Sequence, residues 1–284
     1  MTYVGQIRAF CPGAPARVTA VSAPRTVTRV TDAPDDLDDS VALAARMDAT
    51  RMDLEVLAVR PLSATMVRVE LTGDALRTLT YVSGQDLMLT ASAGPPVERR
   101  RWTIRSLDRV RGVVALDMVL HPDGGASRLH LAVVGETVEA IGPRGKVHLV
   151  EDARVHHFLG DQSFLPAAFV LAEAVRRPAR AAVTLTVPGP DDRLPLDAPA
   201  CADGPVWVEA QGDDEATGLA LLAASGLGEH EDGVVAYVGG EMTLASTIRS
   251  ALVRDRGWPR EAVLPKPYWR RGTANARHGE PGRD

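Results

Sequence analysis

The residues best suited to chemistry lie in one short run, Arg99 to Asp108, which reads RRRWTIRSLD. Trp, Thr and Ile favour strands, and strand side chains alternate between two faces, so we expect Arg100 and Trp102 on the same face. An arginine offers a planar fork for a phosphate, an indole offers a stacking surface, and Thr103 adds a hydroxyl and a backbone N–H. These groups suit a dinucleotide that carries a flat heteroaromatic ring. The run also fits an edge strand with solvated arginines, and that alternative stays open from this segment alone.

Composition excludes several other kinds of chemistry. The 284 residues are 45% hydrophobic and 24% charged, and the net charge of -5 gives no general attraction to nucleic acid or to an anionic membrane. Cys11 and Cys201 are too few for an iron–sulfur cluster or a cysteine zinc site, so redox chemistry would need an organic cofactor. No apolar run is long enough for a membrane span, and no disulfide framework is indicated. We therefore expect a cytoplasmic protein without nucleic-acid or membrane partners.

Hydrolytic and metal chemistry also lack support in the sequence. His156 and His157 are adjacent on an expected strand, so they point to opposite faces and cannot chelate one ion together. The chain has no Gly-x-Ser-x-Gly or His-Glu-x-x-His motif, and its acidic residues isolate no catalytic pair. No metal site is predicted.

Residues 1–52 differ from the rest of the chain. The first 31 residues contain no Asp or Glu and show no sustained periodicity, and a cluster of aspartates and a possible short helix around Val41 to Met47 follow. We expect this extension to be disordered or poorly ordered, with Met47 and Met52 as alternative starts. The polar tail, residues 273–284, is also expected to be disordered.

Residues 53–152 read as a small antiparallel barrel. Short runs of alternating or β-branched residues are separated by turns at the spacing typical of such barrels. The expected strands are Leu54–Val59, Thr65–Leu71, Leu87–Thr90, the run at 99–108, Val113–His121 and Thr137–Ile141. Between the last two strands, Gly124-Gly125-Ala126-Ser127 could present backbone N–H groups to a phosphate, although a glycine pair before a helix is also an ordinary turn.

Residues 153–272 alternate strands with helices, which predicts a mostly parallel sheet with ligands at the carboxyl ends of its strands. Two turns fall at such ends, Gly160 to Ser163 and Gly239 to Glu241, and neither is a GxGxxG fingerprint. Near the end of this region, Tyr268 and Trp269 stand between cations. They could cover a ring or bind an anion, or they could pin the terminus to the sheet.

Taken together, the motifs resemble the siderophore-interacting proteins, a family of ferric-siderophore reductases among the ferredoxin-reductase-like flavoproteins. The resemblance runs from about Asp53 to Gly272 and rests on seven motifs in the same order. They are Arg100–Arg105, Asp117–His121, Gly124–Arg128, Gly142–Gly145, Gly160–Pro166, Gly239–Glu241 and Tyr268–Gly272. It implies a two-domain monomer, in which a small antiparallel FAD-binding β-barrel precedes a Rossmann-like α/β domain that binds NADH or NADPH.

The resemblance also implies roles for individual residues. Arg100 would pair with the FAD pyrophosphate, Trp102 would stack on the flavin or its ribityl chain, and Thr103 would hydrogen-bond near N5. Trp102 and Thr103 are thus the catalytic candidates. The other implied FAD contacts are Ile104, Arg105, His121, Gly125, Ala126 and Ser127. The residues implied to frame NADH or NADPH are Gly160, Asp161, Gln162, Ser163, Gly240 and Glu241.

The implied reaction is NAD(P)H-dependent reduction of a ferric siderophore, which would release Fe(II) because Fe(II) binds hard oxygen ligands less well. An anionic siderophore needs a cationic mouth, for which the candidates are Arg105, Arg128, Lys266 and Arg270. Trp269 is a further candidate for substrate binding. Two alternatives stay open: another flavin- or ferredoxin-type reductase, and a flavin- or siderophore-binding protein without turnover.

Several positions depart from the family pattern. Trp102 replaces a Tyr and keeps a stacking ring, whereas Pro122 replaces a Gly and a Pro before Ala126 is absent. Gln162 stands where the family has Glu, which removes a charge beside the expected nicotinamide site.

The choice between NADH and NADPH stays open. Asp191, Asp192 and Arg193 follow the second strand of the nucleotide domain, and they argue in opposite directions for a 2′-phosphate.

Overall fold

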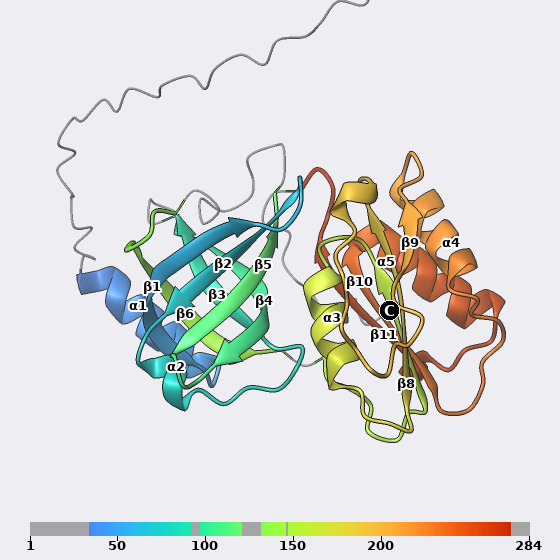
Figure 1. Ribbon diagram of the computed structural model, residues 1–284, viewed down its shortest axis with the longest axis horizontal. Helices are drawn as coiled ribbons and strands as arrows, with labels where there is room; N and C mark the ends of the chain where they lie inside the picture. The colour runs from blue at the N-terminus through green and yellow to red at the C-terminus, as the bar shows by residue number, and fades with distance from the viewer. Residues whose placement is uncertain (1–33, 93–96, 121–131, 146, 274–284) are drawn as a thin grey trace, which may run out of the picture.

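Alternating apolar residues build the first half of the chain into a closed barrel. The computed structural model describes residues 34–92, 97–120, 132–145 and 147–273. The barrel strands are β1 (Thr50–Pro61), β2 (Met66–Thr72), β3 (Asp86–Ser92), β4 (Glu98–Asp108), β5 (Val113–Val119) and β6 (Thr137–Arg144), in the spatial order β1-β2-β5-β4-β3-β6 (Figure 1). Every second residue of these strands points inward, so Leu54, Leu71, Leu89 and Leu116 are fully buried together. A short helix, α2 (Ala75–Thr78), adds the buried Leu76 to this core.

The helix α1 (Pro34–Arg46) packs on the outer wall of the barrel, on the side away from the second domain (Figure 1). Ala44 is 4% exposed and clusters with Met88 of β3 and Ile141 of β6. Arg51 of β1 donates to the buried Ser40 of this helix at 3.1 Å. The expectation of disorder was therefore wrong for residues 34–52, because an apolar stripe covers barrel surface that would otherwise be wet. Residues 1–33 lie outside the described residues.

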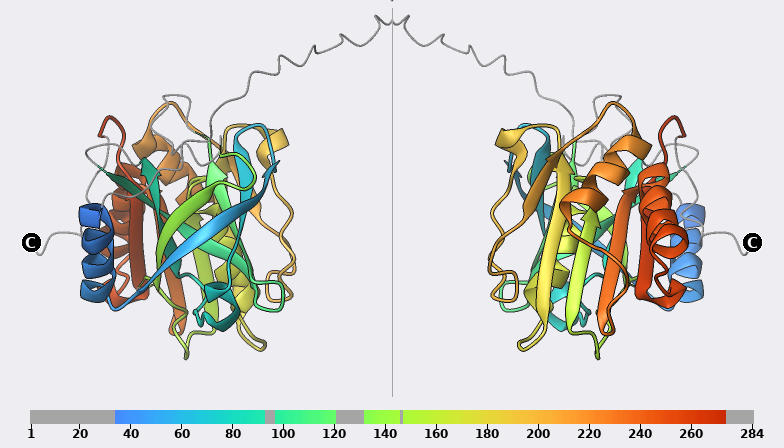
Figure 2. Two further views of the ribbon diagram at one scale, coloured as in Figure 1. Left: turned by 90° about the vertical axis from the view of Figure 1, so that its left-hand side faces the viewer. Right: turned by 90° about the vertical axis from the view of Figure 1, so that its right-hand side faces the viewer.

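The second half forms three layers around a parallel sheet. Its strands are β7 (Val155–Gly160), β8 (Arg180–Val187), β9 (Val206–Glu209), β10 (Val234–Glu241) and β11 (Val263–Trp269), in the order β11-β10-β7-β8-β9. Helix α3 (Leu165–Ala174) lies between the sheet and the barrel, while α4 (Asp214–Ala224) and α5 (Met242–Ser250) pack together on the opposite face (Figures 1 and 2). Short helical turns cover Pro190–Asp192, Ala251–Asp255 and Arg260–Ala262. The predicted fold class, a barrel followed by a parallel α/β domain, is confirmed.

The order of strands reverses between β7 and β10. The chain builds outward from β7 through β8 to β9, then returns to place β10 on the other side of β7. Gly160 therefore pairs with Gly239, and the two turns expected at carboxyl ends of strands lie side by side. A Cβ on Gly160 would lie 2.3 Å from the Gly239 carbonyl oxygen, so this close approach requires glycine. Such a reversal is where open α/β sheets form a crevice for ligands.

Candidate functional site

The barrel strands β4 and β5 lack ladder pairing beside the residues that the sequence singles out, and we call this unpaired stretch the opening. Arg99 to Thr103 pair with β3, whereas pairing of β4 with β5 begins only at Ile104. The end of β5 continues to pair with β2 up to Val119. In the described strands, then, no ladder bonds join β4 to β5 across this stretch. Unpaired strand edges present N–H and C=O groups that a flat polar ligand can bond.

The arginines of β4 differ in how firmly they are held. Arg101 makes two hydrogen bonds to Asp86, at 2.8 and 2.6 Å, and Arg105 makes two to Glu173 of α3, at 2.7 and 2.5 Å. Among the described residues, Arg100 has only long contacts, 3.4 Å to the carbonyl oxygen of Arg99 and 3.5 Å to Glu98. Arg100 is therefore the one of these three guanidiniums whose donors are best placed to bind a phosphate.

Trp102 lies at the margin of the barrel core. Its register partner Leu87 is fully buried, but Trp102 is only half-buried, like Tyr81, Leu120 and Ala132 around the same core cluster. An indole in this position is supported from below by aliphatic side chains and keeps part of its surface open. Ile104, by contrast, is fully buried, and its amide donates to the Gln85 carbonyl oxygen at 2.9 Å. The structure thus places Ile104 in the core and not at the opening.

The second domain reaches Thr103 through the end of β11. Tyr268 neighbours Thr103, and burial raises the pKa of the Tyr268 hydroxyl above its usual range, while the Thr103 hydroxyl acts in the opposite direction. Lys266 Nζ lies 3.6 Å from Asp86 and 5.4 Å from the ring centre of Tyr268. Burial lowers the pKa of Lys266, which the nearby Asp86 opposes. This ammonium is buried between the domains, so it does not line the solvent-facing mouth for which the sequence suggested it.

Asp161 holds the two carboxyl-end turns together. Its buried carboxylate accepts hydrogen bonds from Ser163 N and Oγ, Glu241 N and Trp269 Nε1, at 2.7, 2.6, 2.6 and 3.0 Å. Burial raises the pKa of Asp161, and these hydrogen bonds counteract the rise. A Cβ on Gly240, which has φ +115, would lie 2.5 Å from the Asp161 carboxyl carbon. The carboxylate of Asp161 therefore accepts all of these hydrogen bonds from groups of its own domain.

The Glu241 carboxylate likewise accepts hydrogen bonds from groups of its own domain. Its carboxylate caps α5 by accepting from Thr243 N and Leu244 N, and it accepts from Arg271 N at 3.1 Å. The Arg271 side chain makes two bonds to Asp214 of α4, at 2.7 and 2.8 Å, and lies over the ring of Trp269. Sequence reasoning missed Arg271 and Asp214, because 57 residues separate them and no spacing rule links them.

Gln162 also bonds across the domain interface. Its Nε2 donates to Thr65 Oγ1 at 2.7 Å, and Thr65 Oγ1 donates to Asp192 Oδ1 at 2.6 Å. Sequence reasoning placed Gln162 beside a nicotinamide, left open whether Asp192 disfavours a 2′-phosphate, and missed Thr65. Arg270 is exposed at the end of β11, whereas His121, Gly125, Ala126, Ser127 and Arg128 lie outside the described residues.

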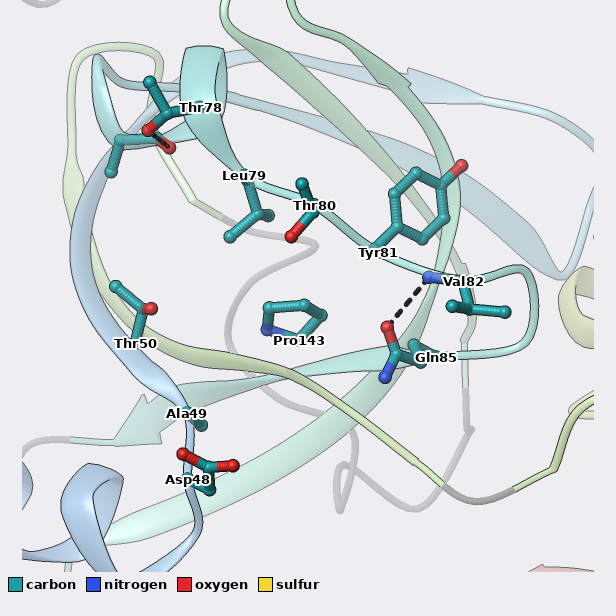
Figure 3. A pocket seen from close by; sticks show the side chains of 11 residues that line it. Asp48, Ala49, Thr50, Thr78, Leu79, Thr80, Tyr81, Val82, Gln85 and Pro143 are labelled. Atoms are coloured by element: carbon teal, nitrogen blue, oxygen red, sulfur yellow. Dashed lines mark hydrogen bonds between the residues drawn. The ribbon is translucent and has the colours of Figure 1, made fainter.

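A separate cavity of about 530 Å³ lies against residues 78–85 (Figure 3). Leu79, Tyr81, Gln85 and Pro143 are among its lining residues, and Gln85 Oε1 accepts a hydrogen bond from Val82 N at 2.9 Å. None of the predicted site residues lines it, so it is distinct from the opening at β4. Over the described part of the chain, no cluster of His, Cys, Asp or Glu could hold a metal ion, and no helix is long and apolar enough to cross a membrane.

Comparison with known proteins connects this arrangement to one family. Residues 153–272 match the family model described as siderophore-interacting protein. A siderophore utilization protein from T. fusca is 28% identical, with a TM-score of 0.70 over 81% of this chain and 96% of that one. The resemblance to siderophore-interacting proteins is confirmed. The siderophore-interacting protein SipS from Aeromonas hydrophila is 25% identical, with a TM-score of 0.66 over 78% of this chain and 92% of that one.

Two further comparisons extend the likeness. Uncharacterised proteins of Mycobacterium tuberculosis and Mycobacterium bovis are 30% identical over 171 residues, a match that spans 51% of this chain and 60% of theirs. The ferredoxin reductase in carbazole 1,9a-dioxygenase is 19% identical with a TM-score of 0.60, over 78% of this chain and 68% of that one, and it shares the two-domain fold.

Proposed function

We propose that this protein is an NAD(P)H-dependent flavoprotein that reduces ferric siderophores and so releases Fe(II). The observation that carries the proposal is the opening between β4 and β5, with Arg100, Trp102 and Thr103 along its edge and Tyr268 of the second domain beside it. The ferredoxin-reductase-like fold and the match to siderophore-interacting proteins support a reductase of the flavin type.

The residues at the opening fit FAD. Within the described residues, Arg100 has only long contacts, so its donors could bind the pyrophosphate. The half-buried indole of Trp102 offers a stacking surface, and the unpaired β4 edge offers backbone groups to a ring. When bound, FAD would accept a hydride from NADH or NADPH and pass its two electrons singly to two Fe(III) ions.

The chain's own residues would position the reactants. The crevice at the β7 and β10 ends, framed by Gly160–Ser163 and Gly239–Glu241, would receive the dinucleotide. Thr103 and Tyr268, both at the domain interface, would exclude water from the place where the two ligands meet. The exposed Arg270 would contribute positive charge toward an anionic siderophore.

An absorbance spectrum of the FAD-loaded protein tests the proposal. We expect a flavin spectrum that bleaches on addition of NADH or NADPH, and Fe(II) that appears, detected with a ferrous chelator, when a ferric siderophore follows. Comparing the two dinucleotides measures the cofactor preference. A fully flavin-loaded protein that neither dinucleotide bleaches, or that yields no Fe(II) from any of several siderophores, would overturn it.

A further inference from the structure

Three polar side chains that are far apart in the sequence form one hydrogen-bonded chain between the domains. Thr65 lies in the turn from β1 to β2, Gln162 directly follows β7, and Asp192 ends the short helical turn after β8. Gln162 Nε2 lies 2.7 Å from Thr65 Oγ1, which lies 2.6 Å from Asp192 Oδ1. Gln162 and Asp192 are only 7% and 4% exposed.

Elementary hydrogen-bond chemistry determines which group donates and which accepts in each of these hydrogen bonds. An amide nitrogen only donates, an ionised carboxylate only accepts, and a threonine hydroxyl has a single proton. That proton must go to Asp192, because the hydroxyl oxygen already accepts from Gln162. Asp192 Oδ1 also accepts from Ser63 Oγ at 2.6 Å and from Thr65 N at 3.1 Å.

The charge state of Asp192 agrees with this direction. Burial by itself would raise the pKa of Asp192, but the hydrogen bonds from Ser63 and Thr65 outweigh it and hold the pKa below its usual value. At neutral pH, Asp192 is therefore ionised and is the final acceptor in this series of hydrogen bonds. The titratable neighbours along the sequence are Asp161, bonded within its own domain, and the exposed Asp191 and Arg193.

We propose that two hydrogen bonds, from Gln162 to Thr65 and from Thr65 to Asp192, fix the position of the carboxyl ends of β7 and β8 relative to the barrel. We call this pair of hydrogen bonds the relay. The three are positioning residues, and their effect on electron transfer rests on the function proposed above. The turn that carries Thr65 is held by backbone hydrogen bonds, because Leu62 N and Ser63 N both donate to the Met66 carbonyl oxygen, at 2.9 and 3.2 Å. Small displacements between reacting groups slow transfer sharply, so a relay at this edge is well placed to control the rate.

The relay also explains why an amide suits position 162 in this chain. A glutamate there would bring a second carboxylate to a hydroxyl whose one proton is already donated to Asp192. The two acidic groups would compete for that proton and repel each other, and the pKa of the introduced glutamate would rise. Once protonated, that glutamate could donate to Thr65 Oγ1 and restore the original direction. The identities of residues 162 and 192 are thus coupled.

Substitutions that reverse donors and acceptors test the relay in the full-length, FAD-loaded protein. We expect Q162E to lower the thermal unfolding midpoint by about 4 °C at pH 8 and to recover most of that loss near pH 5.5. The double variant Q162E/D192N should regain part of the loss at pH 8, because the new amide at position 192 can donate to Thr65, which can then donate to the new carboxylate at position 162. T65V should resemble Q162E at pH 8 without recovering at low pH, and T65S should resemble the wild type.

S63A is the matched control, because it removes the hydrogen bond from Ser63 Oγ to Asp192 and the one from Thr65 N to Ser63 Oγ at 3.2 Å, but leaves the relay intact. Hydrogen exchange at the amides of Leu62, Ser63 and Met66 should rise in Q162E and T65V but not in S63A. Flavin reduction by NADPH or NADH, whichever is faster, should slow roughly tenfold in the first two variants without a matching loss of FAD affinity.

Two results would overturn the relay. One is a Q162E variant whose unfolding midpoint differs from the wild type by the same amount at every pH. The other is a double variant no better than the sum of the single changes. If the wild type cannot be reduced by either dinucleotide, the proposed function fails, yet the unfolding and exchange measurements still decide for or against the relay.

Discussion

Arg105 of β4 and Glu173 of α3 join the two domains through a pair of hydrogen bonds, at 2.7 and 2.5 Å. Their side chains are 17% and 28% exposed, and Arg105 Nε lies 3.8 Å from the buried Asp117. Arg105 is therefore an interdomain contact on the barrel wall. With the relay through Thr65 and the approach of Lys266 to Asp86, it connects the barrel to the second domain at separate points.

Removing the charge from Glu173 should loosen this contact. We expect E173Q to lower the free energy of unfolding by about 2 kcal/mol, between the values for exposed and buried pairs, because Arg105 keeps its charge without its partner. Urea unfolding measures the change, and E151Q, at an exposed loop position, is the control. Equal stability of E173Q and the wild type would show that the pair contributes little.

The loosely held Arg100 should matter for FAD, and an arginine away from the opening should not. We expect R100Q to weaken FAD binding about 10- to 100-fold, because charge-assisted bonds to the phosphates are lost. R111Q, at an exposed turn of the barrel, should bind FAD like the wild type. Flavin fluorescence titration measures both affinities. An R100Q variant with unchanged affinity would place the pyrophosphate elsewhere.

The buried carboxylate of Asp161 should be needed for stability. We expect D161N to lower the free energy of unfolding by about 2 kcal/mol, because the new amide group turns one acceptor into a donor among four donors. D191N, on an exposed residue, should have little effect. Thermal and urea unfolding of the two variants measure the difference. Similar unfolding curves for D161N and D191N would show that the hydrogen bonds of Asp161 do not stabilise the domain.

Acid should destabilise the second domain through His157. Burial lowers the pKa of His157 to about 4, and the adjacent His156 acts in the same direction. The unfolded chain binds a proton at this residue near pH 6.5, so stability is full above that pH and falls progressively down to about pH 4. We expect H157Q to flatten the pH dependence between these limits.

H148Q, at an exposed position, is the control for that experiment and should keep the wild-type slope. Unfolding midpoints measured at intervals from pH 4 to pH 7 make the comparison. Parallel profiles for H157Q and the wild type would assign the acid sensitivity to other groups.

Local periodicity predicted most of the architecture. Alternation predicted the strands of the barrel, and the change to alternating strands and helices predicted the parallel sheet, because both patterns report which face is buried. The expected strand at 99–108 is β4, Glu98–Asp108. The rule that parallel strands end at one edge predicted the Gly160 and Gly239 turns at the same edge of the sheet, and the pairing of β7 with β10 makes them neighbours.

The hydrogen-bond partners of charged side chains could not be predicted from local periodicity. Thr65 and Asp192 are 127 residues apart, and Arg105 and Glu173 are 68 apart. Nothing in a local pattern reveals which carboxylate meets which donor once the domains dock. For that reason Arg105 and Asp161 looked available for ligands in the sequence, and the structure shows both in bonds to the protein itself.

The sequence indicated a possible short helix around Val41 to Met47, but the full extent of α1 and its packing on the barrel could not be predicted, because its aspartates mask a narrow apolar stripe. The placement of this helix has a practical consequence. A chain shortened to begin at Met47 would uncover Met88 and Ile141 on the outside of the barrel. Bare aliphatic patches on β-sheet walls promote self-association, so such a truncated form should express as aggregates even though both domains keep their own cores.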